Sequence, residues 1–373
     1  MPFRFRAFLF SILLGLGLFP LSGGAAELVD AAGRHVVLPA RVERIMAANE
    51  AAAVFVLALA PKRLVAWPQR LSRAALAYLP AKYAALPVTG RLTGAKPTAS
   101  AETVARFHPD LIIDWGRPTP AERARVDRIA IETRVPTLLL DPGFQNMPSQ
   151  LRHVGRAIGA AKRSRDLAER AADIINGLRG TLLTRSPTKP PRVYFGLGRD
   201  GLSTAGSGSE TAAAIAEAGA IDLAARGGRR QMTRAELLHA NPSIVIAQKR
   251  SFYNALRRDP DYRNLKAVRE HHVYLAPALP FGWLDRPDGI NRLIGLDWLS
   301  AIFYPQKYSL DFSTKVRRFY QKFYGMKPSD KALAALLRGA GVRAAAPMVS
   351  NAAGAPLFGP PPNFAPTLPP NLK

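Results

Sequence analysis

Apolar residues recur at steps of three and four in the middle of the chain, over residues 164–185. The apolar set is Leu167, Ala168, Ala171, Ile174, Ile175, Leu178 and Leu182. This spacing places them on one stripe of an amphipathic helix. Ser164 is a candidate N-cap, and Pro187 would end the helix. About 20 residues at 1.5 Å each predict a rod roughly 30 Å long, about the width of a small domain.

Short apolar runs alternate with amphipathic stretches on both sides of this predicted helix. Strands of four or five residues between helices are typical of parallel α/β sheets. The predicted strands cover residues 43–48, 63–67, 87–94, 111–114, 136–140, 192–195, 244–247 and 272–275. The predicted helices cover residues 51–59, 120–133, 210–218, 290–303 and 314–324, and residues 27–39 alternate as expected of a hairpin.

One pattern occurs twice, once on each side of the central helix. Ser100 and Thr233 are cap residues that each stand nine positions before a proline, Pro109 or Pro242. An aliphatic strand begins two positions after each proline. Thr233 also forms a capping box with Glu236. The repeat predicts two similar lobes with parallel, Rossmann-like sheets, joined by the long α-helix.

The two ends of the chain differ in composition from its body. In residues 1–26, Arg4 and Arg6 precede a short apolar run that Pro20 interrupts, which predicts a cleavable secretory signal. We therefore expect a periplasmic protein, and without cysteine it has no acylated anchor. The predicted units are an N-terminal lobe over 27–162, the interlobe helix over 163–186, a C-terminal lobe over 187–325 and a disordered Ala/Pro-rich tail over 326–373.

The chain is strongly basic, with 52 Lys+Arg against 27 Asp+Glu and a net charge of +25. Such a balance attracts anions. The basic residues are scattered without a run or an interleaved aromatic platform, so we do not expect nucleic acid as a partner. The absence of cysteine excludes disulfides, thiolate metal sites and a cysteine nucleophile.

Motifs for cofactors and catalysis are incomplete. Residues 196–201 fit G-x-G-x-x-G, but the loop continues where a dinucleotide site needs a helix. Residues 206–209 (GSGS) do not fit G-x-S-x-G, and the histidines have no metal-ligand spacing. We therefore expect no cofactor, no bare metal ion and no enzyme activity, although an exported α/β enzyme remains the alternative from another class.

Candidate binding residues follow the predicted strands. In open parallel sheets, ligands bind beyond the carboxyl ends of the strands. Arginine forks bind carboxylates, phosphates or catecholates, and indole rings cover flat faces. The candidates in the first lobe are Trp67, Arg91, Trp115 and Arg117, and those in the second lobe are Arg199, Arg250, Tyr253, Phe281, Trp283 and Arg286. If the ligand is an anion held from both sides, these residues converge on one cleft.

Several short stretches occur in the order of a known family. They are residues 29–34 (VDAAGR), 43–45 (ERI), 109–113 (PDLII), 241–246 (NPSIVI) and 291–299 (NRLIGLDWL). Over about residues 27 to 325 the chain resembles the class III periplasmic substrate-binding proteins of ABC importers, which carry ferric siderophores, haem and vitamin B12. The resemblance implies two α/β lobes on one rigid helix, a ligand in the cleft between them and little hinge closing.

The resemblance also implies a membrane partner, the permease of an ABC importer in the inner membrane. The family commonly docks on it through one glutamate in each lobe. Val54 stands at the matching first-lobe position, with Glu50 one turn earlier, and Glu217 lies in the matching region of the second lobe. Glu50 and Glu217 are therefore the docking candidates, and the departure at Val54 puts a symmetrical pair in doubt.

These observations together predict a monomeric periplasmic solute-binding protein. The ligand we expect first is an anionic metal chelate, namely a ferric siderophore. Haem, a corrinoid, and molybdate or tungstate are the alternatives within the same fold. An oxyanion would need a small dry pocket of amides and arginines rather than an open aromatic cleft.

Overall fold

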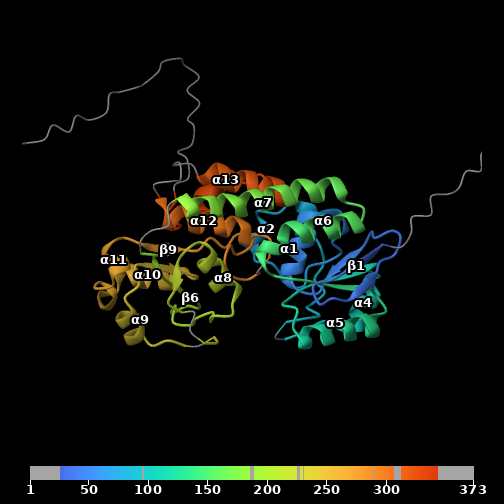
Figure 1. Cartoon of the computed structure of the whole chain (residues 1–373), viewed down its shortest axis with the longest axis horizontal. Helices are drawn as coiled ribbons and strands as arrows, with labels where there is room; N and C mark the ends of the chain where they lie inside the picture. Colours follow the sequence, from blue (N-terminus) through green and yellow to red (C-terminus); the bar gives the residue numbers. More distant parts are fainter. Residues whose placement is uncertain are drawn as a thin grey trace, which may run out of the picture.

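A computed structural model describes residues 26–94, 96–184, 189–224, 227–229, 231–287, 289–305 and 312–342. Two parallel sheets lie side by side under a layer of helices (Figure 1). The predicted secretory segment, apart from its last residue, lies outside the described residues. The same holds for Pro187 and for residues 343–373 of the predicted tail.

The first lobe contains a three-stranded parallel sheet in the order β3-β4-β5. Its strands are β3 (Ile45–Ala47), β4 (Leu111–Trp115) and β5 (Thr137–Leu140). Its helices are α1 (Glu50–Leu59), η1 (Pro61–Arg63), α2 (Arg73–Leu76), α3 (Ala81–Ala84), α4 (Ala101–Phe107), α5 (Pro120–Thr133), η2 (Phe144–Asn146) and α6 (Met147–Ala157). The predicted strands at 63–67 and 87–94 reduce to single bridges, Leu64 with Ile45 and Trp67 with Val88.

The second lobe contains a four-stranded sheet in the order β7-β6-β8-β9, again with parallel pairing. Its strands are β6 (Arg192–Gly196), β7 (Ile221–Asp222), β8 (Ile244–Ala247) and β9 (Val273–Leu275). Its helices are α8 (Glu210–Glu217), α9 (Arg234–Ala240), α10 (Arg250–Arg258), η3 (Pro260–Tyr262) and α11 (Lys266–Arg269). The chain then returns to the helical layer through α12 (Arg292–Phe303), α13 (Phe312–Phe319), the π-helix η5 (Tyr320–Tyr324) and α14 (Asp330–Leu336).

The repeated capping pattern is present in both lobes. The Ser100 hydroxyl accepts from the Thr103 amide at 3.3 Å, and the Thr233 hydroxyl accepts from the Glu236 amide at 3.1 Å. Both helices, α4 and α9, end on a residue with left-handed backbone and lead into an inner strand, β4 or β8. The predicted equivalence of the two segments is therefore confirmed.

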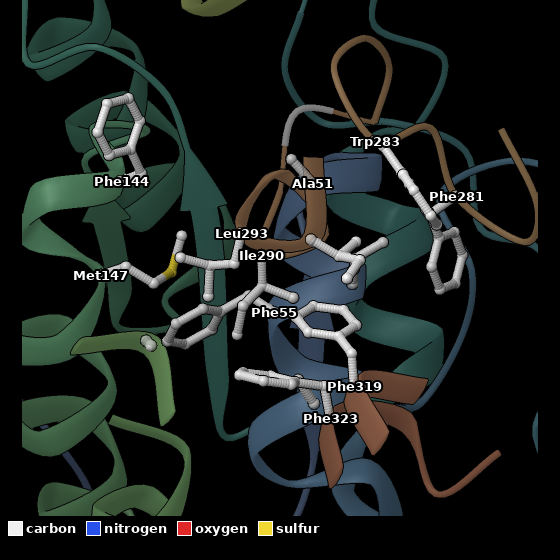
Figure 2. Packing of buried hydrophobic residues seen from close by; sticks show 14 of the residues in the cluster. Ala51, Phe55, Phe144, Met147, Phe281, Trp283, Ile290, Leu293, Phe319 and Phe323 are labelled. Atoms are coloured by element: carbon white, nitrogen blue, oxygen red, sulfur yellow. The ribbon is translucent and has the colours of Figure 1, made fainter. Parts of the chain in front are cut away.

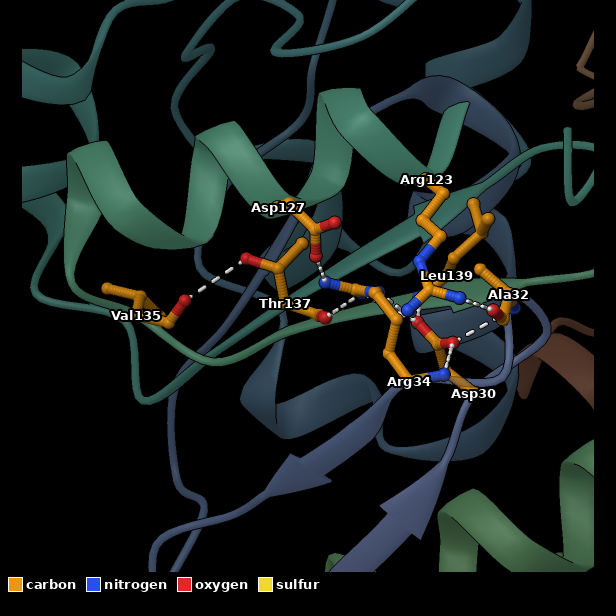
Figure 3. A network of polar contacts seen from close by, with 8 residues as sticks. All are labelled: Asp30, Ala32, Arg34, Arg123, Asp127, Val135, Thr137 and Leu139. Atoms are coloured by element: carbon orange, nitrogen blue, oxygen red, sulfur yellow. Dashed lines mark hydrogen bonds and ion pairs between the residues drawn. The ribbon is translucent and has the colours of Figure 1, made fainter. Parts of the chain in front are cut away.

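The hairpin of β1 (Glu27–Val29) and β2 (His35–Val37) is fastened to the first sheet by its turn (Figure 3). The Asp30 carboxylate accepts from the Arg34 Nε at 2.9 Å and from the Leu139 amide of β5 at 3.1 Å. Arg34 in turn reaches Asp127 on α5 at 3.0 Å. The stretch 29–34 thus has a structural role: it closes the turn and joins it to β5 and α5.

The central helix, α7, runs from Ala161 to Thr184, so its 24 residues span about 36 Å. It packs on α6 and α1 of the first lobe and on α12 of the second (Figure 1). Ser164 is not the N-cap, because the helix begins three residues earlier. Its hydroxyl instead donates to the Ala161 carbonyl at 2.9 Å, and the side chain is buried against Gly155.

One apolar cluster continues through both lobes at the level of the helical layer (Figure 2). Phe55 of α1, Met147 of α6, Leu293 of α12 and Phe319 of α13 belong to it. Arg163 of α7 reinforces the junction, because its Nε donates to the Ala58 carbonyl at 2.6 Å and its Nη2 to the Phe323 carbonyl at 3.1 Å. The lobes are therefore joined by a shared core as well as by the single helix.

The predicted tail begins too early. Residues 326–342 are folded: Ser329 caps α14, and Leu333 and Leu336 are buried. Trp298 of α12 donates its indole N–H to the Ala340 carbonyl at 2.8 Å. The Ala and Pro content of the C-terminal region concealed this last amphipathic turn. Of the helices in the described ranges, none is long and apolar enough to cross a membrane.

Replacing Gly155 by alanine tests the close approach of α6 to α7. A Cβ at Gly155 would lie 2.1 Å from the Ser164 Cβ, so the two helices would have to separate. Overpacking of this kind costs about 1–3 kcal/mol. We expect Gly155→Ala to lower the free energy of unfolding by that amount in a urea titration.

Gly177→Ala is the matched control, since Gly177 lies in α7 where an added Cβ meets no atom within 4 Å. Alanine favours a helix over glycine by about 0.5–1 kcal/mol, so this variant should be as stable as the parent or slightly more so. Equal stability of the two variants would show that the α6–α7 contact is not tight.

Candidate ligand-binding site

A pocket of about 240 Å³ opens at the carboxyl edge of the first sheet. Its wall combines first-lobe residues that follow strands or bridges with one loop from the second half of the chain. The lining residues are Asn49, Glu50, Ala51, Gln69, Arg91, Gly94, Trp115, Arg286 and Pro287. Three predicted ligand residues, Arg91, Trp115 and Arg286, therefore meet at one place.

A buried polar network supports this wall. Asn49 caps α1 by accepting from the Ala52 amide at 3.0 Å, and its amide nitrogen donates to Asp114 Oδ1 at 2.6 Å and to the Trp115 carbonyl at 2.9 Å. The Thr93 hydroxyl also lies 2.6 Å from Asp114 Oδ1. These bonds fix the end of β4 relative to the start of α1, and so they set the shape of the pocket.

Asp114 is the buried acid of this network. Burial raises the pKa of its carboxyl group to about 6, although the hydrogen bonds from Thr93 and the Trp115 amide act to lower this pKa. Its second oxygen, Oδ2, has no hydrogen-bond partner among the described residues. Asn49 and Asp114 stand at the ends of predicted strands, yet sequence reasoning did not choose them or Thr93 as ligand residues, although an asparagine directly before a helix is a recognisable cap signal.

The Arg91 guanidinium is fixed by a tight loop. Gly90 has φ +90°, and a Cβ there would lie 2.9 Å from the Thr98 carbonyl oxygen, so glycine permits the loop to close. The Arg91 amide donates to the Thr98 hydroxyl at 3.0 Å, and the Arg91 Nη2 donates to the Lys96 carbonyl at 3.0 Å. The other terminal nitrogen of the guanidinium, Nη1, lies 3.6 Å from Glu50 Oε1.

Glu50 therefore lies in the pocket. Its side chain is 22% exposed and that of Arg91 is 24% exposed. Glu50 is also the first residue of α1, where the positive end of the helix favours a negative charge. The Glu50 side chain is directed to Arg91 and lines a pocket, so any partner that docks on it has to compete with Arg91, and docking through Glu50 stays a prediction.

The second docking candidate, Glu217, is also engaged within the chain. Its carboxylate accepts from Gln145 Nε2 of the first lobe at 3.3 Å and lies 3.4 Å from Arg179 Nε of α7. Any partner that binds Glu217 has to compete with these contacts.

The predicted cleft aromatics are interior side chains. Trp67 and Phe281 pack with ring centroids 6.0 Å apart, and Trp283 is fully buried with its N–H directed to the Tyr320 hydroxyl at 3.0 Å. Figure 2 shows Phe281 and Trp283 among the apolar residues of the core. This corrects the expectation that the three rings cover a ligand. They hold the base of the loop that carries Arg286.

Arg117 joins the lobes and does not line the pocket. Its Nε donates to Glu210 Oε1 of α8 at 2.8 Å. Glu210 is also 3.5 Å from Arg292 Nη1, and Arg292 donates to the Pro142 carbonyl of the first lobe at 3.2 Å. The three side chains form an ionic bridge between the first lobe, α8 and α12.

The remaining second-lobe candidates lie elsewhere. Arg199 and Arg250 are exposed at the carboxyl end of the second sheet and do not line the pocket. Tyr253 borders a separate groove with Arg257 and Tyr274, next to Gly339. None of these three residues lines the Arg91 pocket, so their convergence with Arg91 on one cleft stays a prediction.

The pocket is suited to an anion. Among the described residues that line it, the two guanidinium groups of Arg91 and Arg286 are accompanied by one carboxylate, that of Glu50, and the N-terminus of α1 adds partial positive charge. Trp115 is buried with an indole N–H that has no partner among the described residues. In the part of the chain that the structure describes, no group of three His, Asp or Glu residues could hold a metal ion.

Comparison with known proteins finds one matching family model and similar proteins. The model of the family described as periplasmic binding protein matches residues 56–279, more than half of the chain. The molybdate-binding protein MolA of Haemophilus influenzae is 30% identical over 155 residues. That match covers 39% of this chain and 43% of the length of MolA.

Solved structures share the fold. An ABC transporter solute-binding protein from Sulfurospirillum deleyianum has a TM-score of 0.76 at 24% identity, covering 84% of this chain and 99% of its own. The structure of H. influenzae MolA bound to molybdate has a TM-score of 0.64 at 19% identity, covering 82% of this chain and 99% of its own. With the family match, the two sheets and the central helix, these likenesses lead to one assignment: the chain belongs to the periplasmic binding protein family.

Proposed function

We propose that this protein is the solute-binding component of an ABC importer and that its cargo is an anion held between Arg91 and Arg286. The observation that carries the proposal is the pocket itself, which arginines from two distant loops line together with the first residues of α1. Charge-assisted hydrogen bonds from arginine and a helix N-terminus are a common means of binding an anion.

The size and lining of the pocket favour a compact oxyanion of the molybdate or tungstate class. A volume of about 240 Å³ is below the roughly 300–1,000 Å³ typical of sites for larger organic ligands. Among the described residues, the polar lining consists of arginines, amides and one glutamate, and Trp115 is the single aromatic residue. The likeness to a molybdate-binding protein supports the same ligand class.

A ferric siderophore is the second candidate. Arg286 is exposed at the rim of the pocket, and the half-exposed Arg117 follows Trp115 by two residues. A larger anionic chelate that enters the pocket with one group would contact Arg286 at the rim and find Arg117 outside the pocket. Haem and corrinoids are less favoured because Trp67, Phe281 and Trp283 are buried and offer no open aromatic face.

Capture in this proposal involves no reaction. The anion exchanges its water shell for guanidinium and amide donors on a wall that is already formed. The continuous core beneath α1, α7 and α12 resists a large hinge motion, so binding depends on local side-chain adjustment. The protein would act as a monomer in the periplasm and deliver its cargo to the permease.

Arg91→Gln tests the charged wall. Losing one charge-assisted contact costs roughly 1.5–3 kcal/mol, so tungstate should bind about 10- to 150-fold more weakly, as measured by calorimetry or by Trp fluorescence. Arg152→Gln is the control, because Arg152 is an exposed residue of α6 that does not line the pocket. Equal tungstate affinity in the parent and in Arg91→Gln would place the cargo elsewhere.

Asp114 should make anion binding depend on pH. With a pKa of about 6, its carboxyl group is ionised at pH 7.5 and mostly protonated at pH 5. Protonation removes a negative charge that lies next to the pocket. The affinity for an anion should therefore rise by about fivefold, on a Coulomb estimate, as the pH falls through about 6. Perrhenate is the suitable probe because its own charge stays constant over this range.

The control is Asp114→Asn, which keeps an oxygen to accept from Asn49 and Thr93 but cannot lose a proton. Its perrhenate affinity should vary less with pH than that of the parent. Glu122 and Arg125 are the charged neighbours that also act on Asp114, and both remain in the variant. The same pH profile in the parent and in Asp114→Asn would rule out Asp114 as its source.

A further inference from the structure

We infer that Glu50 is a resident counter-ion of the pocket, which occupies the anion's place in the empty protein and is displaced when cargo binds. The inference rests on the proposed anion-binding function and adds a residue whose displacement sets a fixed cost for every anion that binds. Glu50 lines the pocket, and Arg91 is its ionic partner among the described residues. It therefore holds the position that an anion would seek, between a guanidinium and a helix N-terminus.

The contact between Glu50 and Arg91 is suited to exchange. Its 3.6 Å separation exceeds the 2.7–3.2 Å or so of a hydrogen bond, so displacement breaks a Coulomb contact alone. The Glu50 side chain is partly exposed, which leaves the carboxylate a path to solvent. Arg91 is different, because the Lys96 carbonyl holds its guanidinium in place. Glu50 is therefore the residue of this pair that can move when an anion binds.

Displacement imposes the same cost on every anion, so the charge of the anion decides whether it overcomes that cost. A monovalent anion that replaces the carboxylate leaves the charge of the pocket unchanged, so it gains little Coulomb energy. A divalent anion adds one negative charge to a site with two guanidinium groups and gains attraction from both. The cost of displacing Glu50 therefore lowers the occupancy of weakly attracted monovalent anions such as chloride, whereas a divalent anion overcomes it, and the cargo class is an anion of charge −2 or more.

Tungstate and perrhenate provide the test, because both are tetrahedral oxyanions of similar size and carry charges of −2 and −1. Both are titrated calorimetrically against the parent protein, Glu50→Gln and Glu169→Gln. Glu169 is an exposed acid of α7 that does not line the pocket, so its variant matches the change in net charge. Thermal melts followed by circular dichroism verify that all three proteins are folded.

We expect Glu50→Gln to bind both anions about 10-fold more tightly, because each is spared the same cost of displacing the carboxylate. Glu169→Gln should bind them like the parent. A gain for tungstate that far exceeds the gain for perrhenate would mean that Glu50 stays in place as a repulsive wall, and it would overturn displacement. Unchanged or weaker binding in Glu50→Gln would overturn the inference as well.

The outcome for the underlying function is separate. If neither anion binds the folded parent or the folded Glu50→Gln variant, anion binding at this pocket is refuted, and the inference falls with it. If the parent binds tungstate and Glu50→Gln binds it no better, the proposed function stands and only the role of Glu50 is lost.

Discussion

The packing of α1, α7 and α12 into one apolar cluster is the constraint on which the rest of the structure depends. It fixes the distance between two sheets that share no strand. It also holds the start of α1, where Asn49 and Glu50 lie, next to the loop that carries Arg286. A binding wall made from both halves of the chain therefore exists before any ligand arrives, because the core that supports it is already closed.

Local patterns were enough to predict the architecture. The stripe from Leu167 to Leu182 predicted the central helix because its spacing follows the helical period, and the two capping residues Ser100 and Thr233 predicted the repeat. Such signals depend on neighbours in sequence. The predicted start of α7 was three residues too late. Ser164 was interpreted as an N-cap, but its hydroxyl forms its hydrogen bond within the helix. The folded turn at α14 was missed because its surroundings are rich in alanine and proline.

The site was predicted only in part, because it depends on contacts between distant residues. Arg91 and Trp115 follow strands or bridges of the first sheet, and this simple rule located them. No local pattern predicts that Trp283 packs against Trp298 and Phe312, or that Arg117 pairs with Glu210, which is 93 positions away in the sequence. The same limit applies to Glu50, whose partner Arg91 is brought close by the loop that Gly90 closes.

The central claim is that an anion binds between Arg91 and Arg286 at the N-terminus of α1. Crystals of the protein soaked in tungstate, with diffraction recorded at the tungsten absorption edge, test it most directly because anomalous scattering locates the metal without a model of the ligand. The account predicts one strong anomalous peak in this pocket, with the Glu50 carboxylate turned away from Arg91. A peak at Arg199 or Arg250 of the second lobe, with none in the pocket, would contradict it.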